Sequence, residues 1–234
     1  MSRIDSLGNK TIIAIDGPAG SGKSTVAKLA ARNLDFTYID TGAMYRALTM
    51  KAIREGIAAG DAEGLIALAA NTVIEQEPAE TGAGARTFVD GEDVSGLIRM
   101  PDVTAAVSEV SAHPGVRKIL VNRQRYLVSE AREGVVVEGR DVGTVVFPDA
   151  TIKIYMDASA KERARRRLKD MQMAGVRVPL EELENLIKTR DETDSNREAS
   201  PLIKAVDAIV INTTGMTVDE TVEAVIALTK SRKG

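Results

Sequence analysis

Five short apolar runs recur along the chain, and each is followed by a polar or glycine-containing segment. Most are rich in Val and Ile, which is typical of buried parallel strands. They lie at 11–16, 36–40, 134–139, 151–158 and 207–214. Between the first two, apolar residues recur every three or four positions and predict a helix over about 22–34; another helix is expected over about 42–55. Strand, helix and strand in this order form a right-handed unit, so the pattern predicts an α/β fold with a five-stranded parallel sheet between two helical layers.

The pattern changes at residues 72–99, after a helix expected near 61–71. Short alternating runs are divided there by Pro78, by the loop TGAGA and by the turn pair Asp90 and Gly91. Such turns are typical of hairpins, so a small antiparallel insert is predicted. Two further helices are expected to meet at HPG (113–115), because proline disfavours helix in the preceding residue.

The basic run KERARRRL predicts a helix with Arg163, Arg166 and Arg167 on one face, followed by the glycine-containing segment MAGVRVP. A later helix must end before Pro201, which cannot continue it. It carries three charged residues spaced four and three apart, on one side: Arg190, Asp194 and Arg197. The spacing alone leaves open whether either group is a solvated surface with weak salt bridges or part of a site.

Composition limits the classes of function. The 234 residues, 44% hydrophobic and 28% charged, suit a single catalytic domain. A net charge of −3 provides no overall field for nucleic acid or an anionic membrane, so neither is an expected partner. The absence of cysteine excludes disulfides and thiolate chemistry, and the single histidine, His113, is expected to be structural. The polar N-terminus and the lack of a long apolar run predict a cytoplasmic protein.

The first strand leads into GPAGSGKS, which fits the phosphate-binding pattern G-x-x-x-x-G-K-[ST]. Its glycines allow backbone N–H groups to face phosphates, Lys23 reaches the β and γ oxygens, and Ser24 faces Mg²⁺. The following helix presents its positive end to the anion. A nucleoside triphosphate is therefore the expected ligand, and its expected contacts are Gly17, Pro18, Ala19, Gly20, Ser21, Gly22, Lys23, Ser24 and Thr25.

A phosphate loop does not identify the phosphate acceptor. The chain lacks N-K-x-D, the base-reading string of switch GTPases, and a motor ATPase is usually longer, with carboxylates after a later strand. The segment YIDTGAMYR instead places Thr41 and Arg46 at the carboxyl edge of the predicted sheet, where ligands bind in such folds. A hydroxyl and a guanidinium in this position are suited to a second anion.

Several strings in this order resemble bacterial cytidylate kinases, which belong to the P-loop nucleoside monophosphate kinases: GPAGSGKST, IDTGAMYR, GEDVSGLIR, EGRDVGTVVFPDA and RDETDSNR. The resemblance runs from about residue 10 to the C-terminus. It implies a monomer that uses ATP and Mg²⁺ to phosphorylate CMP or dCMP. It also implies one kinase domain over 11–234 after an extension at 1–10. The expected parts are a core at 11–71, 100–158 and 200–234, the insert on the monophosphate side at about 72–99, and a helical lid at about 159–199.

The resemblance implies roles for particular residues. Ser108, Arg117 and Asp141 are expected to contact the base, with Arg117 as donor and Asp141 as acceptor. Arg190 is expected on the transferred phosphate, Asp194 on the ribose, and Arg197 on the acceptor phosphate or sugar. The expected catalytic residues are Lys23, Arg140, Arg190, Arg163 and Arg167.

Simpler interpretations exist for the same residues. Arg117 fits a solvated helix face, Asp141 a helix cap or a partner of Arg140, and the insert an elaboration without a catalytic role. For the function, the alternatives are another small-molecule kinase acting on UMP, AMP or shikimate, and a non-catalytic ATP-binding module. The roles of Asp16 and Glu138, near the ends of two predicted strands, are left open.

Overall fold

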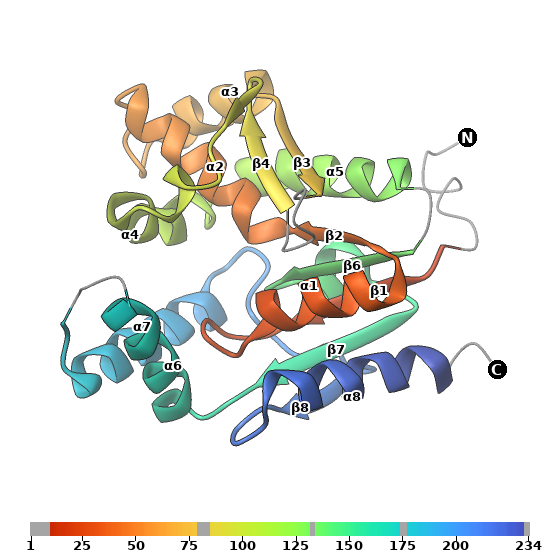
Figure 1. The fold of residues 1–234 in the computed structure, drawn as a ribbon. Helices are drawn as coiled ribbons and strands as arrows, with labels where there is room; N and C mark the ends of the chain where they lie inside the picture. The colour runs from red at the N-terminus through yellow and green to blue at the C-terminus, as the bar shows by residue number, and fades with distance from the viewer. Residues whose placement is uncertain (1–9, 79–84, 132–133, 174–176, 232–234) are drawn as a thin grey trace.

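The computed structural model describes residues 10–78, 85–131, 134–173 and 177–231 (Figure 1). Its strands are β1 (Ile12–Asp16), β2 (Thr37–Asp40), β3 (Ile74–Pro78), β4 (Ala85–Val89), β5 (Glu92–Asp93), β6 (Val135–Gly139), β7 (Ile152–Asp157) and β8 (Ile209–Asn212). Its α-helices are α1 (Lys23–Leu34), α2 (Thr41–Arg54), α3 (Ala62–Asn71), α4 (Pro101–Val110), α5 (Pro114–Glu130), α6 (Ala160–Met173), α7 (Leu180–Asn196) and α8 (Val218–Ser231). A 3₁₀ turn spans Leu97–Arg99, and a π-helical turn spans Val142–Val146.

The predicted five-stranded parallel sheet is confirmed, with the strand order β2-β6-β1-β7-β8. Its central strand, β1, is buried on both faces, as a parallel strand between helical layers must be. Ile13 and Ile15 pack with α1 and α8, whereas Ile12 and Ala14 pack with α5 and the π-helical turn. The fold is therefore the predicted three-layer α/β arrangement, with helices on both faces of the sheet (Figure 1).

The insert is also confirmed as a separate antiparallel sheet, with the order β3-β4-β5. Asp90 and Gly91, with φ of 51° and 84°, form the turn between β4 and β5, and glycine adopts this left-handed conformation without strain. Lys51 forms an ion pair with Asp90, and Arg54 pairs with Glu92, so both residues fix this hairpin to α2. Most of the TGAGA loop lies outside the described residues.

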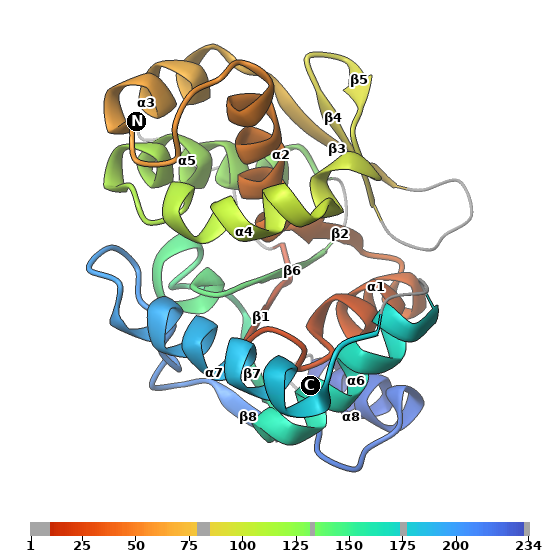
Figure 2. The same cartoon turned by 90° about the vertical axis from the view of Figure 1, so that its left-hand side faces the viewer.

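A second apolar cluster joins the insert to α2, α3, α4 and α5 on one side of the main sheet (Figure 1). It contains Met44 and Leu48 of α2, Ile74 of β3, Val89 of β4 and Leu120 of α5. Helices α6 and α7 lie side by side, away from the insert (Figure 2), and pack around a small apolar cluster of their own. None of the helices within the described ranges combines the length and the apolar character required to cross a membrane.

The two helices expected to meet at HPG do so, because α4 ends at Val110 and α5 begins at Pro114. Pro114 and Gly115 form the first turn of α5, where proline lacks only an N–H that needs no partner. Helix α7 ends at Asn196, before Pro201 as expected, but Arg197 then has an extended backbone. Arg197 is therefore not on the helical stripe predicted for it.

Candidate active site

A cavity of about 1020 Å³ lies at the carboxyl ends of the sheet strands. Its wall combines the phosphate loop and the starts of α1 and α2 with residues of α4, α5, α6 and α7. The predicted site residues that line it are Ala19, Gly20, Ser21, Gly22, Lys23, Ser24, Thr25, Thr41, Arg46, Ser108, Arg117, Arg140, Asp141, Arg167, Arg190, Asp194 and Arg197. Gly17, Pro18 and Arg163 are buried and are not among the residues that line it.

The phosphate loop connects β1 to α1 and depends on glycine at two positions. A Cβ at Gly17 would overlap the backbone carbonyl of Met156. Gly22, with φ of 92°, precedes α1 in the left-handed conformation. No side chain caps the start of α1, so its first N–H groups are available to bind a phosphate.

Lys23 is buried beneath this loop, and its Nζ donates to the carbonyl of Pro18 at 2.8 Å. Burial, followed by the positive charge of Arg140, lowers the pKa of Lys23 to about 7. Arg140 itself donates to the carbonyl of Gly17 at 2.9 Å and to the carboxylate of Asp194 at 2.9 Å. A phosphate group beside Lys23 opposes both effects and stabilises the protonated amine.

Thr41 and Arg46 lie in the first turns of α2, directly after the carboxyl end of β2. The Thr41 hydroxyl donates to the carbonyl of Glu138 at 2.7 Å, while the Asp40 carboxylate caps the helix. Nη1 of Arg46 donates to Thr104 Oγ1 at 2.8 Å and to the carbonyl of Ile98 at 3.2 Å. Both bonds use the same guanidinium nitrogen, so they leave the other nitrogens of Arg46 for a ligand in the cavity that it lines.

Arg117 and Asp141 form a buried ion pair in the cavity wall, each with 5% of its side chain exposed. Arg117 also donates to the carbonyl of Ser111 at 2.9 Å and lies over the ring of Tyr45, 5.1 Å from its centroid. Ser108 of α4 lines the same cavity. The simpler interpretations of this pair are wrong: Arg117 is not solvated, and the partner of Asp141 is not Arg140.

The charged residues of α7 and its C-terminal end face the same space. Asp194 is buried and pairs with Arg140, so the interpretation as exposed salt bridges along one helix is wrong. Nε of Arg190 and one Nη of Arg197 are buried without a hydrogen-bond partner in the described part of the chain. Burial and the neighbouring Arg140 lower the pKa of Arg190 to about 10. Buried guanidinium nitrogens of this kind are costly unless a ligand accepts hydrogen bonds from them.

Sequence comparison identifies the relatives of this chain. The sequence model of the family described as "Cytidylate kinase" matches residues 13–231. The cytidylate kinase of Desulforamulus reducens is 52% identical over 221 residues, which cover 94% of this chain and 97% of that protein. The cytidylate kinase of Geobacillus sp. is 48% identical over 226 residues, which cover 97% and 99% of the two chains. The chain belongs to the cytidylate kinase family.

Two solved structures share the fold of this cytidylate kinase family member at low sequence identity. An uncharacterized protein from Eubacterium ventriosum superimposes with a TM-score of 0.52 and 16% identity, covering 95% of this chain and 99% of the other. A gluconokinase from Sinorhizobium meliloti gives a TM-score of 0.50 and 15% identity, covering 95% and 94%. At this identity the similarity shows the shared fold alone.

The arginines of α6 have different positions in this member of the cytidylate kinase family. Arg163 donates to the carbonyl of Ala19 at 3.1 Å and pairs with Asp191 of α7 at 2.6 Å. Arg166 donates to the carbonyl of Ser21 at 3.3 Å. Both therefore support the backbone of the phosphate loop. Arg166 and Arg167 also line the cavity, whereas Arg163 does not. Sequence spacing could not distinguish the roles of these three arginines. Part of the MAGVRVP segment that follows lies outside the described residues.

Asp16 and Glu138, whose roles the sequence left open, are both buried. The two carboxylate oxygens of Asp16 accept hydrogen bonds from the N–H groups of Val142 and Gly143, each at 2.7 Å. Burial raises the pKa of Asp16 to about 6. Asp16 thus holds the π-helical turn that follows Asp141. Glu138 accepts a hydrogen bond from the Tyr38 hydroxyl at 2.8 Å.

Sequence reasoning missed several residues that shape this cytidylate kinase site. Tyr45 was inside a string that carried the family resemblance, but only the structure places its ring under Arg117. Arg125 donates to the carbonyls of Val145 and Val146, each at 2.9 Å, and so holds the end of the π-helical turn, whereas Asp16 holds its start. No sequence pattern pointed to Arg125. His113, as expected, is away from the cavity, and its ring contacts the carbonyl of Ala59 at 2.7 Å.

Proposed function

We propose that this chain transfers the γ-phosphoryl group of ATP to CMP or dCMP, giving ADP and CDP or dCDP. The observation that carries the proposal is the buried Arg117 and Asp141 pair in the same cavity as the phosphate loop. The two curated relatives described above are named cytidylate kinases, which supports the same acceptor.

The pair is chemically complementary to cytosine. The base presents N3 and O2 as acceptors next to an N4 amino donor. Arg117 and Ser108 supply donors for the two acceptors, and the Asp141 carboxylate accepts from the amino group. Uracil reverses this pattern at positions 3 and 4, so its O4 meets the lone pairs of Asp141. The buried position of the pair makes such a mismatch costly, because water cannot replace the lost hydrogen bond.

The phosphates of the two nucleotides meet at the strand ends, where positive charge is concentrated. Lys23 and the N-terminus of α1 hold the β- and γ-phosphates of ATP. Arg46, Arg190 and Arg197 hold the acceptor and transferred phosphates, and Asp194 the ribose. The acceptor phosphate is already an anionic nucleophile, so the transfer needs positioning and charge neutralisation rather than a strong base. Arg140 bonds to both Gly17 and Asp194 and so fixes the ATP side of the site relative to the acceptor side.

A magnesium ion fits the residues present only together with the nucleotide. The described residues contain no cluster of three histidine or carboxylate side chains that could hold a metal. Ser24 lines the cavity beside Lys23 and supplies a hydroxyl oxygen, whereas both carboxylate oxygens of Asp16 are bound to backbone N–H groups. Mg²⁺ prefers oxygen ligands and commonly takes most of them from water and phosphate. When bound, it neutralises charge on the phosphate oxygens.

The acceptor is tested by measuring ADP release with ATP, Mg²⁺ and a panel of CMP, dCMP, UMP, AMP and shikimate. We expect turnover with CMP and dCMP, with a kcat/KM at least about tenfold above that for UMP. A preference for AMP or shikimate would contradict the acceptor, and no turnover with any of them would contradict the enzyme itself. Lys23→Met serves as the inactive control. The cytoplasmic location and the monomeric state stay predictions. Gel filtration tests the monomeric state.

A further inference from the structure

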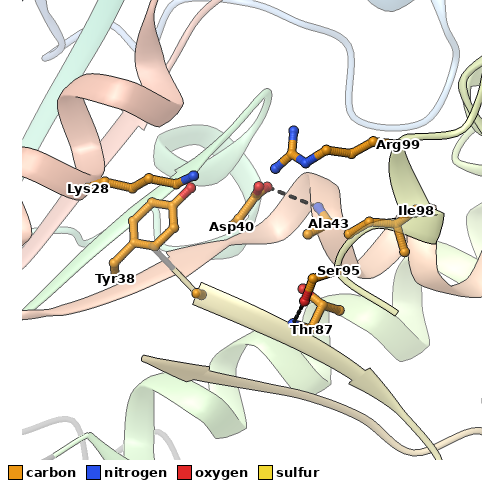
Figure 3. A pocket seen from close by; sticks show the side chains of 9 residues that line it. Lys28, Tyr38, Asp40, Ala43, Thr87, Ser95, Ile98 and Arg99 are labelled. Carbon is orange, nitrogen blue, oxygen red and sulfur yellow. Dashed lines mark hydrogen bonds between the residues drawn. The ribbon is translucent and has the colours of Figure 1, made fainter. Parts of the chain in front are cut away.

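A second, smaller cavity of about 180 Å³ opens between the insert and the core of the molecule (Figure 3). It is formed by Lys28 of α1, the end of β2, strand β4 and the turn Leu97–Arg99. It shares part of its wall with the large cavity, and the shared residues are Asp40, Ala43, Ile98 and Arg99. The turn that ends the insert therefore reaches the site where the acceptor phosphate is proposed to bind.

The backbone position of Arg99 is set by contacts on both sides of the turn. The side chain of Ile98 is 2% exposed and packs in the cluster that joins the insert to α2. The carbonyl of Ile98 accepts a hydrogen bond from Arg46 at 3.2 Å. The arginine proposed to hold the acceptor phosphate thus also anchors the residue directly before Arg99.

The guanidinium of Arg99 is directed over the carboxylate of Asp40, toward the start of α2 (Figure 3). It makes no hydrogen bond or ion pair with another residue of the described ranges. Burial lowers the pKa of Arg46, and the positive charge of Arg99 is the next largest cause. The two guanidiniums therefore repel each other across a shared cavity wall, and an anion between them relieves this repulsion.

We propose that Arg99 binds the phosphate of the acceptor nucleotide together with Arg46, so that the insert supplies a substrate-binding group. This rests on the proposed function, because it takes a nucleoside monophosphate as the acceptor. A phosphate dianion suits the position, since two fork-shaped donors at one end of a cavity match its oxygens. The insert then does more than cover the site.

The test compares Arg99→Ala with the wild-type chain on CMP and on cytidine, which has the same base and sugar but no phosphate. Loss of one charged hydrogen bond to phosphate raises the KM for CMP about tenfold to a hundredfold. The KM for ATP and the inhibition constant of cytidine are expected to stay within twofold. Arg99→Lys keeps the charge and is expected to be intermediate. Arg54→Ala removes an arginine from the same joint between α2 and the insert, outside both cavities, and is expected to leave the KM for CMP unchanged.

Three results would overturn the assignment. The first is an unchanged KM for CMP in Arg99→Ala. The second is a rise in the inhibition constant of cytidine equal to the rise in the KM for CMP, which shows that Arg99 only shapes the cavity. The third is the disappearance of the effect in an Asp40→Asn background, which shows that Arg99 serves as the counter-ion of Asp40. Failure of the proposed function looks different, because the wild-type chain itself then neither binds nor phosphorylates CMP; that result removes both proposals.

Discussion

The carboxylate of Asp141 is the residue that distinguishes cytosine from uracil in the proposed site. Its oxygens can only accept hydrogen bonds, and one of them is bound by Arg117. An asparagine at this position has nearly the same shape, but its amide can also donate. The preference between the two pyrimidines therefore depends on one side chain whose place in the cavity wall is fixed by an ion pair.

We expect Asp141→Asn to lower kcat/KM for CMP by about a hundredfold, because the cytosine amino group loses a charged acceptor. The value for UMP should fall less or rise, since the amide can donate to O4. Steady-state kinetics with both acceptors measures the ratio. The substitution also leaves Arg117 without a charged partner, so denaturant unfolding must show that the variant is folded; the loss of stability should not exceed about 3 kcal/mol.

Equal losses on CMP and UMP would contradict the base-reading role of Asp141. Asp93→Asn is a suitable control, because Asp93 forms an exposed pair with Arg86 in the insert and lies outside both cavities. It should leave both acceptors unaffected.

The residue types of the site were predictable from the sequence, but the directions of the side chains were not. Arg163, Arg166 and Arg167 follow one another on a single basic helix, and local spacing gives them the same face. In the structure, Asp191 and the carbonyl of Ala19 bind Arg163, while Arg167 lines the cavity. These partners are distant in the sequence or belong to the backbone, and neither leaves a local pattern.

At the level of secondary structure elements, a glutamine side chain of the insert forms hydrogen bonds with the edge strand of the main sheet. Strand β2 is the edge strand, so backbone groups on its outer side need partners. Gln76 of β3 accepts from the N–H of Asp40 at 3.0 Å and donates to the carbonyl of Asp40. The amide of Gln76 thus continues the sheet and fixes the residue that directly precedes Thr41.

We expect Gln76→Leu to destabilise the protein by about 1–2 kcal/mol, because two hydrogen bonds are lost at a half-buried edge. The KM for CMP should rise several-fold, while the KM for ATP stays the same, since only the acceptor side of the cavity is attached to the insert. Denaturant unfolding and steady-state kinetics measure the two effects. Glu75→Leu, at the exposed neighbouring position on β3, is the matched control. A rise in both KM values would contradict a specific link to the acceptor side.

The elements themselves differ in how far local sequence determines them. The five parallel strands and the insert were predictable, because apolar runs and turn residues act locally. The end of α7 was not, because residues beyond it decide where it stops: the N–H of Leu202 donates to the carbonyl of Asp194 at 2.8 Å, and Arg197 donates to the carbonyl of Ser200 at 2.5 Å. The π-helical turn after Asp141 likewise depends on Asp16, which is 126 residues away from Val142 in the chain.

On the scale of the whole molecule, the cavity collects positive charge that the folded protein does not fully neutralise. Burial and neighbouring arginines lower the pKa values of Lys23, Arg46 and Arg190. Each shift means that the charged group is less stable in the folded protein than in the unfolded chain. The chain thus gives up stability in its free state for a site that two phosphate-bearing substrates neutralise.

This cost predicts how global stability depends on pH. The pKa of Lys23 is about 7 in the folded protein and 10.5 for an ordinary lysine, so between these values the unfolded chain binds more protons than the folded one. Stability must therefore rise with pH in this window, and the contribution of Lys23 between pH 7 and 9 is about 2 kcal/mol. Denaturant unfolding at a series of pH values measures the rise. Lys23→Met should show no such rise, and saturating ATP should abolish it in the wild-type chain, because the bound phosphates keep Lys23 protonated. The same slope in both proteins would show that other groups cause it.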